Sequence, residues 1–182
     1  MLRISTLLLL IALTGAAQAT ESGWALLREG GHVVLIRSAM APGSGEPHNF
    51  EIDKCRTQRN LSERGRQQAR KIGALIAARA APVELVLTSR YCRTRETARL
   101  AFGDSEDFTP LDPPSEDEDE RAVQIEAILQ EIRDYSGSGN LILVTHLETI
   151  KALTGEPARE GEAVIVRPDE EKLHILGRII FN

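Results

Sequence analysis

Three residues suited to binding an anion stand at or just after the ends of apolar runs in the sequence. Arg37 follows the run 32–36, Arg93 lies shortly after the run 85–87, and His146 closes the run that begins at residue 141. A guanidinium group can grip two oxygens of a phosphoryl group at once, and an imidazole can exchange a proton near neutral pH. Together they indicate a phosphoryl site. Ser38, beside Arg37, decides whether that site could also react.

The apolar runs themselves are typical of buried parallel strands, and ligands bind at the carboxyl ends of such strands in an open α/β sheet. Apolar residues at helical spacing predict helices from Ser62 to before Pro82, over 90–102 and around 123–132. Two closing strands are expected at 163–167 and 173–181. This alternation predicts an α/β protein, a three-layer α/β/α sandwich with a mostly parallel central sheet.

Two serines are expected to cap helices. Ser62 begins the first long helix, although Gly65 stands where Glu or Gln would complete a capping box. Ser89 is a plausible N-cap for the helix over 90–102. Arg93 would then lie in the first turn, where free N–H groups and the helix dipole already favour an anion.

A long loop, residues 39–60, begins at the expected site and contains Pro42, Gly43, Gly45 and Pro47. Its length favours a lid or a substrate-facing segment over a simple connection. The acidic run 115–120 is interpreted as a solvated loop and the start of a helix, with a cation site as the alternative.

The first nineteen residues have the pattern of a secretory signal peptide: Arg3, an apolar stretch over 7–13, and a small-x-small cleavage site at 17–19. A buried N-terminal helix is the alternative. We therefore expect a signal peptide at 1–19, one domain at 20–182, export to the periplasm or medium, and no stable membrane insertion. The net charge of −5 gives no electrostatic reason to expect nucleic acid as a partner.

The chain has two cysteines, Cys55 and Cys92. Export into an oxidising compartment would allow them to form a disulfide, and two free buried thiols are the alternative. No histidine pattern accompanies them, so we predict no zinc site, and nothing in the sequence calls for another metal or a cofactor.

Four ordered segments make the chain resemble the histidine phosphatase superfamily, which has the phosphoglycerate-mutase-like fold. Its opening signature, an apolar strand followed by Arg-His-Gly or Arg-His-Ala, resembles residues 35–39, where the letters are Leu-Ile-Arg-Ser-Ala. Its second and third segments resemble residues 61–69 and 89–98, and its fourth, an apolar strand followed by histidine, resembles residues 141–146. With the expected signal peptide, the chain is most similar to the small exported bacterial branch.

The resemblance implies a two-step reaction in which a histidine attacks phosphorus and water then releases phosphate. By position, Arg37, Arg93 and His146 would bind the phosphoryl group, while Ser38 occupies the place of the nucleophile. A serine needs a positioned base, and a phosphoserine ester is more stable than a phosphohistidine. The family often places an acid after the third segment; here Asp112 is the candidate, with Glu116 as the alternative.

The expected function is therefore binding of a phosphorylated small molecule or envelope component, with phosphatase activity lost or impaired. One alternative is an active phosphomonoesterase that works at a reduced rate through His146 or a water nucleophile. A second is a non-catalytic interaction protein that relies on the acidic run and the long loop. Glu148, two residues after His146, is expected to point to solvent rather than into the site.

Overall fold

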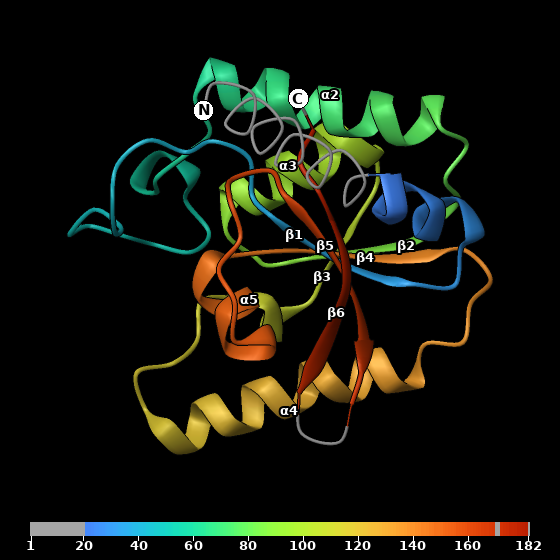
Figure 1. Cartoon of the computed structure of the whole chain (residues 1–182). Helices are drawn as coiled ribbons and strands as arrows, with labels where there is room; N and C mark the ends of the chain where they lie inside the picture. The colour runs from blue at the N-terminus through green and yellow to red at the C-terminus, as the bar shows by residue number, and fades with distance from the viewer. Residues whose placement is uncertain (1–20, 170–171, 182) are drawn as a thin grey trace, which may run out of the picture.

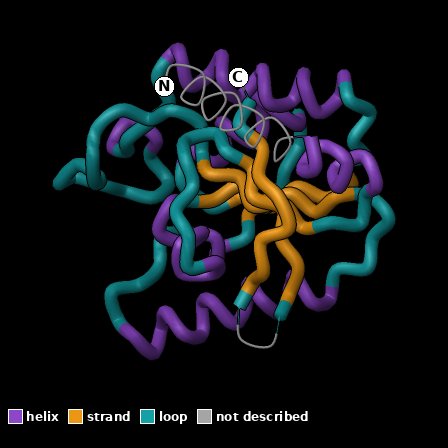
Figure 2. The backbone as a smooth tube through the Cα atoms, viewed as in Figure 1, coloured by secondary structure: helices purple, strands orange, loops and turns teal. Residues whose placement is uncertain are grey.

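In the computed structural model, which describes residues 21–169 and 172–181, a six-stranded sheet lies between two layers of helices (Figures 1 and 2). The sheet order is β3-β2-β4-β1-β5-β6. The strands are β1 Val33–Arg37, β2 Val83–Thr88, β3 Glu106–Asp107, β4 Asn140–Thr145, β5 Ala163–Pro168 and β6 Leu173–Ile179. Strands β1 to β4 pair with one another in parallel, whereas β5 pairs antiparallel with both β1 and β6. The predicted α/β sandwich with a mostly parallel sheet is therefore confirmed. The predicted signal peptide lies outside the described residues.

Two layers of helices cover the sheet. The helices are α2 Glu63–Ala78, α3 Cys92–Phe102, α4 Glu118–Asp134 and α5 Leu147–Thr154, with 3₁₀ turns η1 Cys55–Thr57 and η2 Thr109–Leu111; residues 21–29 are also helical. Figure 1 shows α2 along one side of the sheet and α4 along the other. None of the described helices combines the length and apolar character needed to cross a bilayer.

The period of two along each strand divides the core into two parts. On β1, Val34 and Ile36 pack with Ile72 of α2, whereas Leu35 packs on the opposite face with Ile128 of α4. Every residue of β4 is buried. A central strand that is apolar on both faces needs helices on both, which fixes the three layers.

The serine at the start of α2 caps that helix as predicted. Its Oγ accepts a hydrogen bond from Gly65 N at 3.0 Å. A Cβ at residue 65 would lie 2.1 Å from Met40 O, so only glycine fits there. The close approach of the long loop therefore explains why a capping-box glutamate is missing, and it fixes the start of that loop against α2.

The predicted start of the next helix is wrong by two residues. The N-cap of α3 is Tyr91, and α3 begins at Cys92. Arg93 nevertheless lies in its first turn. Ser89 caps no helix because its side chain is used in a different network, described below.

Candidate anion site

The carboxyl ends of three adjacent parallel strands bring the predicted residues together. In the order β2-β4-β1, Arg37 ends β1 opposite Thr145, and His146 follows at the end of β4. Arg37, Ser38, Arg93 and His146 all line one small pocket of about 20 Å³, together with Arg59, Leu147, Glu148 and Glu160. We call this the anion pocket. Leu147 and Glu148 are the first residues of α5, so the positive end of a helix dipole also faces it.

His146 is buried and both of its ring nitrogens have partners. Nδ1 lies 2.9 Å from Arg93 Nη2, and Nε2 lies 2.7 Å from Ser89 Oγ. Because a guanidinium can only donate, Nδ1 must accept and the ring proton must sit on Nε2, where it is donated to Ser89. Burial and the nearby charges of the arginines lower the pKa of His146 well below its usual value. His146 is therefore neutral, in one defined tautomer.

Asp112 completes this chain on the side away from the anion pocket. Its carboxylate accepts from Ser89 Oγ at 2.8 Å and forms a two-point pair with the Arg90 guanidinium, at 2.9 and 2.7 Å. Arg90 N also donates to it. Asp112 does not line the anion pocket; it supports the ring of His146 through Ser89. Glu116, the alternative acid, is exposed and does not line it either.

Arg93 is almost fully buried, with a relative exposure of 4%, and its guanidinium is already paired. Nη2 donates to His146, and Nη1 donates to Glu46 Oε1 at 2.5 Å. Its guanidinium carbon also lies 4.8 Å from the centre of the Tyr91 ring. Burial lowers the pKa of Arg93, and the Glu46 carboxylate counteracts part of that effect.

Arg59 is a third arginine of the pocket and was not among the predicted site residues. Its Nη1 donates to the carbonyls of Ala41 and Gly43 at 2.9 and 3.0 Å, while its Nε is buried without a hydrogen-bond partner among the described residues. The only available signal was its position just before the segment 61–69. Arginines at 56, 64 and 66 share that neighbourhood, so no local pattern distinguishes Arg59 from them.

Arg37, Ser38 and Glu148 complete the pocket. Arg37 Nη1 donates to Ala158 O at 2.8 Å, and its Nη2 lies 4.0 Å from Glu160 Oε1. The Ser38 backbone N–H donates to Thr145 O, but its hydroxyl has no hydrogen-bond partner within the described part of the chain. Glu148 is exposed, as expected, yet it also contributes to the rim of the pocket. Nothing in the described part of the pocket holds the Ser38 hydroxyl against a base.

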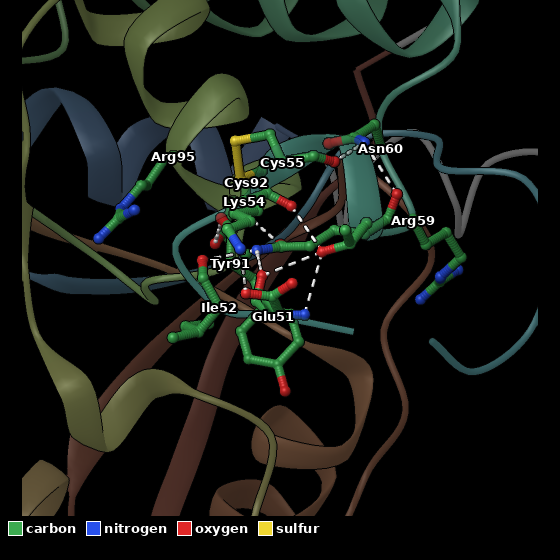
Figure 3. The surroundings of a disulfide bond; sticks show 12 residues. Glu51, Ile52, Lys54, Cys55, Arg59, Asn60, Tyr91, Cys92 and Arg95 are labelled. Carbon is green, nitrogen blue, oxygen red and sulfur yellow. Dashed lines mark hydrogen bonds and ion pairs between the residues drawn. A yellow bond between two sulfur atoms is a disulfide. The ribbon is translucent and has the colours of Figure 1, made fainter. Parts of the chain in front are cut away.

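A disulfide joins Cys55 of the long loop to Cys92 at the start of α3 (Figure 3). Gln58 strengthens this connection, because its Oε1 accepts from Cys92 N at 2.9 Å and its Nε2 donates to Ile52 O at 2.6 Å. Cys92 directly precedes Arg93, so the crosslink that holds the loop lies next to this arginine of the anion pocket. The described residues contain no cluster of three or more His, Cys, Asp or Glu side chains suited to a metal ion.

Comparison with known proteins identifies the architecture. Residues 48–113 match the family model described as "Histidine phosphatase superfamily (branch 1)". The structure also resembles phosphoglycerate mutase from Thermus thermophilus, with a TM-score of 0.59 over 83% of this chain and 99% of that chain, at 18% sequence identity. The chain has the histidine phosphatase fold. The predicted resemblance to this superfamily is thereby confirmed.

Two further structures of the histidine phosphatase fold carry ligands. The protein histidine phosphatase SixA complexed with tungstate has a TM-score of 0.57 and 15% identity, covering 82% of this chain and 97% of that chain. A mutant phosphoserine phosphatase from Entamoeba histolytica in complex with phosphoserine has a TM-score of 0.60 and 10% identity, covering 83% and 98%. No curated protein matches the chain. The matched segment 48–113 contains Arg59 and Arg93, while Arg37, Ser38 and His146 lie outside it.

Proposed function

We propose that this protein is an exported phosphate-binding protein with the histidine phosphatase fold, whose phosphatase activity is lost or impaired. Arg37 and Arg93 bind the phosphate group of a phosphorylated small molecule or envelope component, and His146, which lines the same pocket, becomes a third donor when its Nδ1 takes up a proton together with the anion. Ser38 occupies the position of the nucleophilic histidine. The observation that carries the proposal is the convergence of Arg37, Arg93 and His146 on one pocket around a serine hydroxyl that is hydrogen-bonded to no base among the described residues.

The charges around the pocket favour a multiply charged anion. Three arginines, Arg37 of β1, Arg59 of the long loop and Arg93 of α3, outnumber the two carboxylates that line the pocket, those of Glu148 and Glu160. The N-terminus of α5 is directed at the same place. Arginines are well suited to phosphate because their planar forks match its oxygens. The ligands named in the related structures, tungstate and phosphoserine, are an oxyanion and a phosphate monoester, which agrees with this choice.

The hydrogen bonds of His146 argue against an efficient serine reaction. A base for Ser38 would need a free lone pair, but Nδ1 of His146 accepts from Arg93 and Nε2 carries a proton directed at Ser89. His146 cannot serve as the base for a water nucleophile for the same reason. The reduced-rate phosphomonoesterase is therefore the weaker alternative.

The crosslink supports export. Disulfides persist in the bacterial periplasm and outside the cell, and Cys55–Cys92 accounts for both cysteines of the chain. A signal peptide over 1–19 predicts that the exported protein begins at Thr20. Mass spectrometry of the intact protein recovered from the periplasm or medium tests this, and retention of residues 1–19 would contradict it.

Binding is tested by calorimetry with inorganic phosphate and with tungstate. Arg93→Ala is expected to weaken binding by about 100-fold or more, since it removes a buried guanidinium with charge-assisted hydrogen bonds. Arg95→Ala is the matched control: Arg95 lies on the same helix, is half-exposed, pairs with Asp107 and does not line the anion pocket, so affinity should not change. Absence of binding, or equal binding by the Arg93→Ala variant, would refute the anion site.

Catalysis is tested separately with p-nitrophenyl phosphate. The unchanged protein and Ser38→Ala should show little or no turnover, whereas Ser38→His should gain it if only the nucleophile is missing. High turnover by the unchanged protein that disappears in Arg93→Ala would show that the activity is intact, and the proposal of lost catalysis would then be wrong.

A further inference from the structure

One side chain of the long loop turns inward while its neighbours face solvent. Residues 42–49 are exposed except for Glu46, whose side chain has a relative exposure of 19%. Its Oε1 accepts from Arg93 Nη1 at 2.5 Å, and its Oε2 accepts from the backbone N–H of Arg59 at 2.9 Å. The carboxylate thus uses both of its oxygens to bind groups of the anion pocket.

This contact occupies an N–H donor of the Arg93 guanidinium, on which phosphate binding depends. Each terminal nitrogen of Arg93 already gives one hydrogen bond, Nη1 to Glu46 and Nη2 to His146, so an incoming anion must compete with the Glu46 carboxylate for the Nη1 side of that guanidinium. The remaining pocket of about 20 Å³ has room for roughly one water molecule, not for a phosphate. A phosphate can engage the Arg93 fork with two of its oxygens only after Glu46 has left.

The loop is built so that Glu46 can leave without disturbing its anchors. The tip of the loop, residues 42–49, contains Gly43 and Gly45, whose φ values of 93° and 68° are positive, and Pro47 directly follows Glu46. On one side of the tip, the N–H groups of Ala39 and Met40 are held by Thr97 Oγ1 and Gln68 Oε1. On the other side, the Cys55–Cys92 disulfide holds the loop to α3.

We propose that Glu46 is an internal ligand of the anion pocket, which competes with phosphate for Arg93 and must swing out before an external anion binds. The inference rests on the proposed function, since it assigns a regulator to the same site. The carboxylate occupies Arg93 in the free protein, and a phosphate, with more charge and more acceptor oxygens, displaces it. The observed affinity for phosphate is accordingly lower than the arginines alone would give.

The test is the affinity for inorganic phosphate and for tungstate of the full chain carrying Glu46→Gln, measured by calorimetry. Removing the charge but keeping the shape should tighten binding by about tenfold, because the amide competes less well for a guanidinium. Glu51→Gln is the matched control. Glu51 lies on the same loop and forms an equally short but exposed ion pair with Lys54, and it does not line the anion pocket, so affinity should stay unchanged. Thermal unfolding checks that both variants are folded.

The outcomes separate this inference from the proposed function. Tighter binding by Glu46→Gln alone supports it. If the unchanged protein binds phosphate and Glu46→Gln binds equally or less tightly, Glu46 is not a competitor and the inference is overturned, while the proposed function stands. An equal gain in Glu51→Gln would also overturn it, because a general change in loop charge would then be the cause. If neither the unchanged protein nor Glu46→Gln binds phosphate or tungstate, the proposed function fails and the inference fails with it.

Discussion

The anion pocket has two parts that are held in different ways. The strand-end part, Ser89, Asp112 and His146, follows the edges of the sheet, is buried and forms a continuous hydrogen-bonded chain. The loop part, Glu46 and Arg59, belongs to a segment that is mostly exposed and is fixed by a disulfide and by backbone carbonyls. Both parts meet at Arg93, which pairs with His146 on one side and Glu46 on the other.

This difference assigns separate tasks to the two parts. A buried, fully bonded network keeps its geometry whether or not a ligand is present, because breaking any bond leaves a polar group unsatisfied. An exposed tip between firm anchors loses few buried contacts when it moves, so it belongs to the least stable part of the structure. The strand-end part therefore fixes the shape of the site, and the loop part controls access to it.

The largest effect should come from removing the crosslink of the loop part. Cys55→Ser together with Cys92→Ser opens a covalent loop with a sequence separation of 37, and the chain-entropy relation gives a loss of about 4 kcal/mol in the free energy of unfolding. Denaturant unfolding measures this loss. Amide chemical shifts of the folded variant should change over residues 42–58 and stay the same in β4.

A reducing agent provides the control for this variant. It should destabilise the unchanged protein by a similar amount and leave the double variant unaffected. Chemical-shift changes as large in β4 as in the loop would contradict the separation of the two parts, because the crosslink would then shape the whole fold.

The next largest effect should come from breaking the strand-end chain at Ser89. Ser89→Ala leaves the Nε2–H of His146 without an acceptor in a buried place, at a cost of about 2 kcal/mol in the free energy of unfolding. Asp112 keeps its pair with Arg90, so the loss should stay local. Chemical denaturation measures it, with Ser136→Ala as an exposed control that should change little. A loss as small as that of the control would mean that the chain contributes nothing to holding His146.

The strand-end part was predictable from the sequence because its geometry follows from a rule. Parallel strands end at the same edge of a sheet, so His146 of this part could be placed beside Arg37 from three apolar runs alone. The apolar character of β1 and β4 likewise predicted a sheet covered on both faces. Ser89 was expected to cap α3, but α3 starts two residues later than its capping pattern indicates. Its hydroxyl bonds to Asp112 and His146 instead.

The loop part could not be predicted in the same way. The segment 39–60 has no hydrophobic period, and nothing local shows that Glu46 alone among residues 42–49 turns inward. Its direction depends on Arg93, which lies far along the chain, and on a glycine backbone with positive φ. Arg59 was hidden among neighbouring arginines for the same reason: only tertiary contacts distinguish it.

The smallest expected effect concerns pH and tests the strand-end part through His146. The folded-state pKa of His146 lies well below the unfolded value of about 6.5, so the unfolded state binds the proton first as the pH falls. The neutral ring therefore contributes stability that is complete above about pH 6.5 and is lost progressively below it, down to the folded-state pKa. His146→Asn removes this dependence and leaves the other titrating groups in place. Between about pH 7 and about pH 5.5, in a buffer free of phosphate, the unchanged protein should lose about 1 kcal/mol more unfolding free energy than the variant. Parallel pH profiles would show that His146 is protonated as easily in the folded protein as in the unfolded chain, and the tautomer fixed by Arg93 and Ser89 would then be wrong.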